Sequence, residues 1–337
     1  MWKLIRIPLF ALPVEFAHSM GMRALKASAP LNPNKKTYPL QLQSGVPNFL
    51  NVLNPIGLAA GLDKNAEVLL ALPSLGFGYA EIGTITPIPQ GGNEKPRMFR
   101  NAKTESLFNR MGFNNLGAGI VSERLRKAKP HLPADFKVGV NLGKNKITAD
   151  ADAASDYAKV ASAFLDCADY FVINVSSPNT PGLRSLQSQE ALIPIVKAVQ
   201  EVVAASKDRK IPILVKLSPE LVLKDPEHAY QGLLKALEDQ KIDGLVLTNT
   251  IQGEHIYRGR ALSGGWSGRC LTEMSYEALV LTKKLTSLPI ISVGGIHSTE
   301  EVKKRFAAGA SLVQIYSAWV YEGPYFIRKL IRNLKKS

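Results

Sequence analysis

The sequence "YFVINVSSPNTPGLR", residues 170–184, joins an apolar run to a dense polar loop. Its start, "YFVIN", is apolar almost throughout, which is typical of a strand buried on both faces of a sheet. The whole stretch holds two asparagines, three serine or threonine residues and two prolines. Because these residues also form ordinary turns, the loop alone does not distinguish a tight turn from a binding site.

The same pattern recurs along the chain. Seven further apolar runs end in Gly, Ser, Thr, Asn or Lys, and helix-like stretches lie between the runs. They are "IGLAAGLDK" (56–64), "AEIGT" (80–84), "KVGVNLGKN" (137–145), "IPILVKLS" (211–218), "GLVLTNT" (244–250), "LPIISVGG" (288–295) and "SLVQIYS" (311–317). Apolar strands that alternate with helices predict a parallel sheet covered on both faces. Eight such units predict an α/β fold, the closed (β/α)8 or TIM barrel.

Composition narrows the classes of partner. The 337 residues include 42 Lys and Arg against 28 Asp and Glu, a net charge of +14, which favours anionic small molecules or an anionic membrane surface. No basic run is interleaved with aromatic residues, so we expect no nucleic-acid partner. The two cysteines, Cys167 and Cys270, make no disulfide framework, and neither a Cys-x-x-Cys pair nor a His, Cys, Asp and Glu cluster predicts a metal.

Residues 1–40 differ in pattern from residues 41–337, to which we assign the barrel. The N-terminal apolar run is short and interrupted by Pro8, Pro13 and Glu15, so it cannot cross a bilayer. It predicts two short amphipathic helices broken at Pro13. The apolar face of the first would carry Trp2, Ile5, Leu9 and Phe10. Such a helix lies on a membrane surface or packs on its own domain, and the pattern favours neither.

The carboxyl ends of barrel strands are where active sites of this fold lie. The predicted strand ends carry Ala60, Gly61, Asp63, Lys64, Thr84, Asn141, Asn174, Ser177, Lys216, Thr248, Asn249, Thr250, Gly294, Gly295, Tyr316 and Ser317. Glycine pairs let backbone N–H groups approach a phosphate, and asparagines suit a planar ligand with alternating donors and acceptors. A lysine can neutralise an electron-rich ring or a phosphate, or form a Schiff base.

The motifs, taken in order, resemble those of the dihydroorotate dehydrogenases. The loop "INVSSPNTPGLR" resembles the active-site loop of that family. The other matches are "GLAAGLDKN", "EIGTITP", "PRMFR", "NRMGFNN", "NLGKNK", "VKLSP", "TNT", "GGWSGR", "VGGI" and "GASLVQIYS". The resemblance implies a barrel that binds flavin mononucleotide (FMN) and oxidises (S)-dihydroorotate to orotate in de novo pyrimidine (UMP) biosynthesis.

Two features resemble the quinone-dependent (class 2) branch of this family. Ser177 stands where the soluble branch has a cysteine, and residues 1–40 resemble the helical extension of the membrane-associated branch. The resemblance implies a membrane quinone as final electron acceptor and peripheral attachment to an anionic membrane surface. We also expect a monomer, although no sequence feature specifies the oligomeric state. No presequence is visible, which favours the cytoplasmic side of a cell membrane. The chain has Pro13-Val14-Glu15 where the family has Asp-Pro-Glu. The resemblance therefore does not define the details of the quinone entrance.

The resemblance also assigns site residues. Ser177 would be the general base that takes the C5 proton, helped by a proton relay through Thr180. The substrate would be bound by Lys64, Asn109, Arg110, Met111, Gly112, Phe113, Asn174, Asn179, Asn249 and Thr250. FMN would be bound by Ala60, Gly61, Leu62, Asp63, Lys64, Thr84, Asn141, Asn174, Lys216, Thr248, Gly268, Gly295, Tyr316 and Ser317. The quinone side would carry His18, Arg100 and Tyr316, and no metal is expected.

Other interpretations of the residues stay open. Ser177 is also explained as a turn-forming hydroxyl before Pro178, His18 as a surface histidine, and either lysine as a salt-bridge residue at the barrel mouth. A phosphosugar lyase or isomerase on the same barrel would use Lys216 as a Schiff-base lysine and would be colourless. The soluble branch, linked to fumarate or NAD, would have no use for residues 1–40. The protein could also be a membrane-surface binding module that has kept a degenerate barrel. The intact polar strand ends argue against this alternative.

Overall fold

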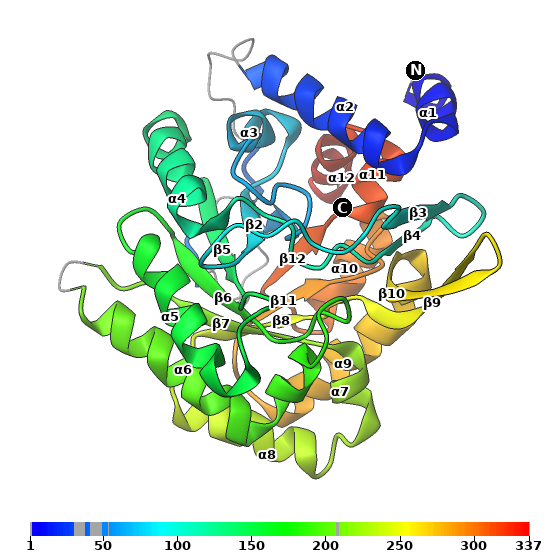
Figure 1. Cartoon of the computed structure of the whole chain (residues 1–337). Helices are drawn as coiled ribbons and strands as arrows, with labels where there is room; N and C mark the ends of the chain where they lie inside the picture. Colours follow the sequence, from blue (N-terminus) through cyan, green and yellow to red (C-terminus); the bar gives the residue numbers. More distant parts are fainter. Residues whose placement is uncertain (1, 30–37, 41–48, 53, 207–208, 337) are drawn as a thin grey trace.

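Eight parallel strands close into a barrel in this computed structural model, which describes residues 2–29, 38–40, 49–52, 54–206 and 209–336 (Figure 1). The strand order around the barrel is β1-β12-β11-β8-β7-β6-β5-β2. The strands are β1 (Ile56–Leu58), β2 (Tyr79–Ile85), β5 (Lys137–Leu142), β6 (Tyr170–Asn174), β7 (Ile213–Leu217), β8 (Gly244–Leu247), β11 (Ile290–Val293) and β12 (Leu312–Ile315). Each lies within or overlaps one of the eight predicted runs, so the predicted TIM barrel is confirmed.

Bulky side chains fill the barrel interior below the strand ends. The rings of Tyr79 and Tyr170 lie edge to face with centroids 6.5 Å apart, and both are fully buried. They pack against Gly57 and Gly139, where a Cβ atom would lie 2.3 Å and 2.1 Å from the tyrosine rings. Each glycine is therefore required because it leaves room for a ring in the barrel floor. This packed floor confines any ligand to the carboxyl ends of the strands.

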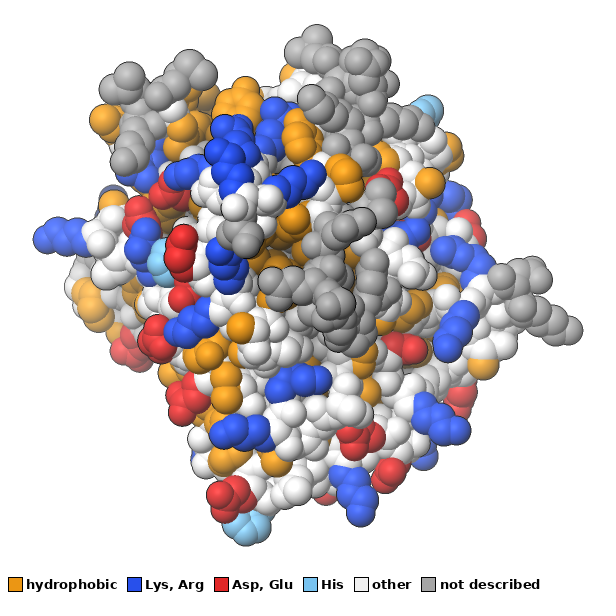
Figure 2. All heavy atoms as spheres, turned by 180° about the vertical axis from the view of Figure 1, so that it is seen from behind, with side chains coloured by type: hydrophobic (Ala, Val, Ile, Leu, Met, Phe, Trp, Pro, Cys, Tyr) orange, Lys and Arg blue, Asp and Glu red, His pale blue; other side chains and the backbone are white. Residues whose placement is uncertain are grey.

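Helices surround the barrel (Figure 1). They are α3 (Leu72–Leu75), α4 (Gly117–Ala128), α5 (Ala153–Ala163), α6 (Gln189–Ala204), α7 (Pro219–Lys224), α8 (Ala229–Asp239), α9 (Thr272–Leu285), α10 (Thr299–Ala307), α11 (Ser317–Glu322) and α12 (Phe326–Leu334). The start of α10 is capped by Ser298, whose hydroxyl accepts from the Glu301 N–H at 3.1 Å, as the capping-box pattern predicts. Helix α12 buries its apolar face and exposes Lys329 and Arg332, so the basic C-terminal run is a solvated helix face. Figure 2 shows Lys and Arg side chains spread over the back of the molecule with acidic residues among them.

The two longest connections carry a small second sheet that the sequence patterns do not indicate. It consists of β3 (Met98–Asn101), β4 (Ser106–Asn109), β9 (Ile251–Tyr257) and β10 (Arg260–Gly268), in the antiparallel order β3-β4-β10-β9. Since β3 and β4 follow β2 and β9 and β10 follow β8, this sheet lies at the carboxyl end of the barrel, beside the expected site.

The N-terminal extension forms the two helices expected from its pattern. Helix α1 (Trp2–Ala11) ends just before Pro13, and α2 (Val14–Ser28) begins directly after it. The Trp2 indole and the Arg6 guanidinium both donate to the Tyr321 carbonyl at 2.9 Å, so α1 packs on α11. The predicted division between residues 40 and 41 adjoins ranges 30–37 and 41–48, which lie outside the described residues. Among the helices described, none has the length and apolar character needed to cross a membrane.

Candidate active site

Two adjoining cavities lie at the carboxyl ends of the strands, with volumes of about 80 Å³ and about 120 Å³. We call the first the glycine cavity and the second the asparagine cavity. They share the lining residues Ala60, Lys216, Asn249, Thr250, Ser267 and Tyr316. Because they share these walls, the two cavities are parts of one site.

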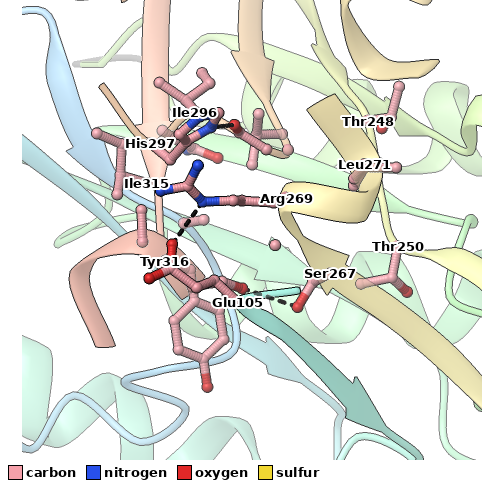
Figure 3. Close-up of a pocket in the computed structure, with 18 of the residues that line it drawn as sticks. Glu105, Thr248, Thr250, Ser267, Arg269, Leu271, Ile296, His297, Ile315 and Tyr316 are labelled. Atoms are coloured by element: carbon pink, nitrogen blue, oxygen red, sulfur yellow. Dashed lines mark hydrogen bonds and ion pairs between the residues drawn. The ribbon is translucent and has the colours of Figure 1, made fainter. Parts of the chain in front are cut away.

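The glycine cavity lies between β11, β12 and the end of β10 (Figure 3). Gly295 has a φ of +67°, and a Cβ atom there would lie 2.3 Å from the Thr272 Cα. Only glycine fits this position, and it leaves backbone open to the cavity. The hydroxyls of Ser267 and Ser317, which also line this cavity, lie 2.9 Å apart. Of the residues predicted to bind FMN, this cavity is lined by Ala60, Lys216, Thr248, Gly268, Gly295, Tyr316 and Ser317.

An ion pair lies at the outer edge of the glycine cavity. Arg269 Nε lies 2.5 Å from Glu105 Oε2, and both residues line the cavity (Figure 3). Glu105 belongs to the turn between β3 and β4, so this pair ties the small sheet to the segment that follows β10. Neither residue was singled out from the sequence, because each lies in a loop without a strand-end pattern.

The asparagine cavity collects most of the predicted substrate residues. Its lining includes Gly61, Lys64, Thr84, Asn109, Met111, Gly112, Phe113, Asn174, Ser177, Asn179, Asn249 and Thr250. Asn249 Nδ2 donates to Asn174 Oδ1 at 3.2 Å, and Asn174 Nδ2 donates to Thr84 Oγ1 at 2.9 Å. Asn179 Nδ2 donates to Asn109 Oδ1 at 2.7 Å. The amides are thus brought together from β4, β6, the loop after β6 and the end of β8.

Two polar atoms of this cavity are left for a ligand. Within the described part of the chain, Asn179 Oδ1 and Thr250 Oγ1 are buried and have no hydrogen-bond partner. Buried polar atoms in folded proteins nearly always have partners, so such atoms in a cavity wall are available to a polar ligand or to water. One acceptor and one hydroxyl match a ligand that carries both N–H and C=O groups.

Ser177 is buried in the loop after β6, and its hydroxyl accepts from the Asn179 N–H at 3.2 Å. Arg184 anchors the loop by donating to the carbonyls of Ser176 and Thr250, at 3.1 Å and 3.0 Å. The predicted relay partner Thr180 makes no hydrogen bond through its hydroxyl to any described residue. The relay through Thr180 therefore stays a prediction.

Glu81 was missed by the sequence analysis, although it is the one charged residue in the strand "YAEIGTI". It is fully buried beneath the site, and its Oε1 lies 3.5 Å from Lys216 Nζ. Asn141 Nδ2 donates to the same oxygen at 2.6 Å, and Gln314 Nε2 donates to Oε2 at 2.7 Å. Asn141, predicted to bind FMN, lines neither barrel cavity. It is instead hydrogen-bonded to the side chains of Glu81 and Thr84.

Lys64 is held at the edge of the asparagine cavity, where its ammonium donates to the Gly61 carbonyl at 2.5 Å. Burial, together with the nearby charge of Arg97, lowers the pKa of Lys64 to about 8, while Asp63 and Glu15 oppose the shift. The Asp63 carboxylate points away, accepting from the N–H groups of Glu67 and Val68 at 2.8 Å and 2.9 Å. Burial raises the pKa of Asp63.

Two other predicted residues also lie outside the walls of both barrel cavities. Arg110 lines neither cavity, and its Nε is buried without a partner among the described residues. Leu62 lines a third cavity instead. Both positions adjoin lining residues in the sequence, which is why motif matching selected them.

The third cavity lies under α1 and α2 and measures about 620 Å³. Its wall is mostly apolar and includes Trp2, Ile5, Leu9, Phe10, Val14 and Leu25, together with the predicted residues His18, Arg100 and Tyr316. Burial, together with the charge of Lys64, lowers the pKa of His18 to about 4. Met98, Leu107 and Tyr316 also line the asparagine cavity, so the two cavities share one wall.

A closed barrel with a glycine-lined pocket, a cluster of amides and a buried lysine at its strand ends defines an α/β-barrel enzyme. The family model described as dihydroorotate dehydrogenase matches residues 41–337. The chain therefore belongs to the dihydroorotate dehydrogenase family.

Relatives and solved structures agree with this assignment. The chain is 40% identical to "Dihydroorotate dehydrogenase (quinone)" of Deinococcus radiodurans, covering 100% of this chain and 95% of the relative. A protein of the same name from Natronomonas pharaonis is 42% identical, with 100% and 94% covered. The crystal structure of DHODH in complex with ferulenol from Eimeria tenella has a TM-score of 0.81 and 34% identity, covering 95% of this chain and 90% of that one. The resemblance seen in the sequence is thus confirmed, whereas the roles of single residues stay predictions.

Proposed function

We propose that this protein oxidises dihydroorotate to orotate on FMN in the barrel and passes the electrons to a membrane quinone bound under α1 and α2. The observation that carries this proposal is the shared wall of the three cavities. Tyr316 lines all of them, and Met98 and Leu107 line both the amide-lined asparagine cavity and the apolar one. A polar substrate and an apolar oxidant would thus meet the same cofactor from two sides.

The residues at the strand ends fit FMN. The backbone of Gly295 and the hydroxyls of Ser267 and Ser317, which all line the glycine cavity, suit its phosphate. Lys216 lines both barrel cavities and would face the side of the flavin ring on which negative charge grows. When bound, FMN would supply the acceptor for the hydride that leaves C6 of the substrate.

The asparagine cavity suits dihydroorotate, whose ring alternates N–H and C=O groups and carries a carboxylate. Asn109, Asn174, Asn179 and Asn249 would bind the ring, and Lys64 would pair with the carboxylate. Ser177 would take the C5 proton as the C5=C6 double bond forms. A serine hydroxyl is a weak base, so exclusion of water by the loop around Ser177 is part of this proposal.

The quinone assignment rests on the apolar cavity and on the names of the relatives. Helices α1 and α2 expose Ile7 and Phe16, which do not line the apolar cavity, beside basic residues, as expected of an extension that rests on an anionic bilayer. We infer peripheral attachment at the cytoplasmic side of the cell membrane, and a monomer.

An anaerobic visible spectrum tests the whole proposal. The purified protein should be yellow, bleach on addition of dihydroorotate, and recover its colour when a quinone without a side chain, such as menadione, is added. Bleaching without recovery would move the protein to the soluble branch of the family. A colourless protein that FMN cannot reconstitute would contradict the proposal and favour Schiff-base chemistry at Lys216.

A further inference from the structure

A chain of hydrogen bonds connects the helical extension to the loops of the asparagine cavity. It begins at Glu15 in the first turn of α2, whose Oε2 lies 3.1 Å from Arg97 Nε. The other carboxylate oxygen accepts from the Arg97 N–H at 3.2 Å. Arg97 is buried, and the Glu15 side chain is 23% exposed, so the pair is largely shielded from water.

Arg97 in turn binds the chain segment that precedes β3. Its Nη1 donates to the carbonyls of Gly91 and Asn93, at 2.6 Å and 3.3 Å. Gly92 between them has a φ of +78°, and a Cβ atom there would lie 2.2 Å from the Met111 carbonyl oxygen. The turn is therefore wedged between the guanidinium and the Met111 segment.

Asn93 then joins two loops that carry predicted substrate residues. Its Nδ2 donates to the Arg110 carbonyl and to the Asn179 carbonyl, each at 3.0 Å. Its own backbone N–H donates to the Met111 carbonyl at 3.0 Å. One residue thus sets the spacing between the loop of Asn109 to Phe113 and the loop that holds Ser177.

We propose that Glu15 is a positioning residue for the substrate site, acting through Arg97 and Asn93 on the loops around Met111 and Asn179. None of these three residues lines either barrel cavity, so their effect on a ligand would be indirect. The extension would then have a second task besides enclosing the apolar cavity. This inference rests on the proposed function, because it takes orotate and dihydroorotate as the ligands of the asparagine cavity.

The test is calorimetric titration of the flavin-loaded protein with orotate at about pH 6, which measures binding without turnover. At this pH, well below the Lys64 pKa of about 8, the ammonium that would pair with the ligand carboxylate stays charged, so loss of the Glu15 charge does not act through Lys64. We expect Glu15→Gln to raise the Kd about fivefold, within the range that substitutions in a contact network produce. Asn93→Ala should raise it at least as much, and the double variant should be no worse than Asn93→Ala alone, because both act on one route. Stopped-flow reduction at saturating dihydroorotate should change less than the Kd does.

Arg6→Met is the matched control. It removes another hydrogen bond between the extension and the barrel, to the Tyr321 carbonyl. Tyr321 itself bonds to the carbonyls of Asn101 and Ser106, and not to Asn93 or to the loops of Met111 and Asn179. The orotate Kd should stay at the wild-type value in this variant. An unchanged Kd in Glu15→Gln and Asn93→Ala, or equal increases in Glu15→Gln and Arg6→Met, would overturn the inference. If the wild-type protein itself binds no orotate, the proposed function fails instead. Should Glu15→Gln not fold, Glu15→Asp takes its place, since it keeps the charge but draws the carboxylate away from Arg97, and an unchanged Kd in that variant would overturn the inference.

Discussion

Lys216 and Glu81 form the most deeply buried ion pair at the site, with side chains 6% and 0% exposed. A buried charge without its partner is costly, because protein groups replace water poorly as its solvent. Asn141 and Gln314 also donate to the Glu81 carboxylate and hold it in place. The Lys216 ammonium pairs with this fixed carboxylate, and its position at the cavity wall is therefore restricted. At the scale of the residue, buried Glu81 thus fixes the position of Lys216 in the cavity wall.

Replacing Glu81 with Gln should lower the free energy of unfolding by about 3 kcal/mol, since it leaves the Lys216 ammonium unpaired. Urea denaturation followed by circular dichroism measures this. Asp166→Asn breaks the pair with Arg126, which is exposed on both sides, and should cost less than about 1 kcal/mol. Equal losses in the two variants would show that burial of the Glu81 pair has no special weight.

Replacing Ser177 with Ala should slow flavin reduction by dihydroorotate at neutral pH by about 100-fold or more, because a general base is lost. The ratio of visible to ultraviolet absorbance should show full flavin content, since Ser177 is not among the residues predicted to bind FMN. Stopped-flow bleaching under nitrogen measures the rate. Wild-type reduction in this variant would remove Ser177 from the role of base.

Affinity for orotate should depend on pH through Lys64. Its pKa is lowered to about 8, so the ammonium that would pair with the carboxylate persists below pH 8 and is lost as the pH rises through that value. We therefore expect the orotate Kd to rise between about pH 7 and about pH 9, a unit on either side of this pKa. In Lys64→Met the Kd should be high and flat across this range, and a rise of the same size there would exclude Lys64 as the cause.

At the scale of elements, α1 and α2 form the outer wall of the apolar cavity, and α2 also reaches the substrate loops. Gly21 of α2 lines this cavity, and a Cβ atom there would meet no atom within 4 Å. A large side chain at this position would therefore fill the cavity without straining the helix backbone.

Gly21→Trp should slow quinone reoxidation of the reduced flavin about tenfold or more, while dihydroorotate reduces the flavin at the wild-type rate. Double-mixing stopped flow separates these two steps. Gly119 of α4 is also a helical glycine with open space around it, but it lies on the exposed surface away from all three cavities. Gly119→Trp should leave both steps unchanged. Slower flavin reduction in Gly21→Trp alone would contradict the assignment of this cavity to the quinone.

The elements differ in how well the sequence predicts them. The barrel strands are continuous apolar runs bounded by Gly, Ser, Thr or Asn, so their periodicity predicts them directly. Strands β9 and β10 were missed because β9 alternates between half-buried and exposed residues and β10 contains three glycines, a pattern that resembles a loop. Asn174 and Asn249 were identifiable because they end strands, whereas Glu81 lies inside one and Arg97 and Asn93 lie in a loop. The partners of Glu81, Arg97 and Asn93 come from distant segments of the chain, and no local sequence pattern reveals such contacts.

At the scale of the whole molecule, the chain combines a polar site at the barrel mouth with a separate apolar cavity built from the extension. The central claim is that substrate and quinone occupy different cavities that meet at Tyr316. If so, a ligand that fills the asparagine cavity leaves the apolar one free.

The most direct test is the rate at which a quinone reoxidises the dihydroorotate-reduced protein, measured by double-mixing stopped flow with and without saturating orotate. Our account predicts that orotate leaves this rate unchanged at every quinone concentration. If orotate instead raises the quinone concentration needed for half-maximal rate, in proportion to its own occupancy, both ligands share one cavity and the two-cavity account is wrong.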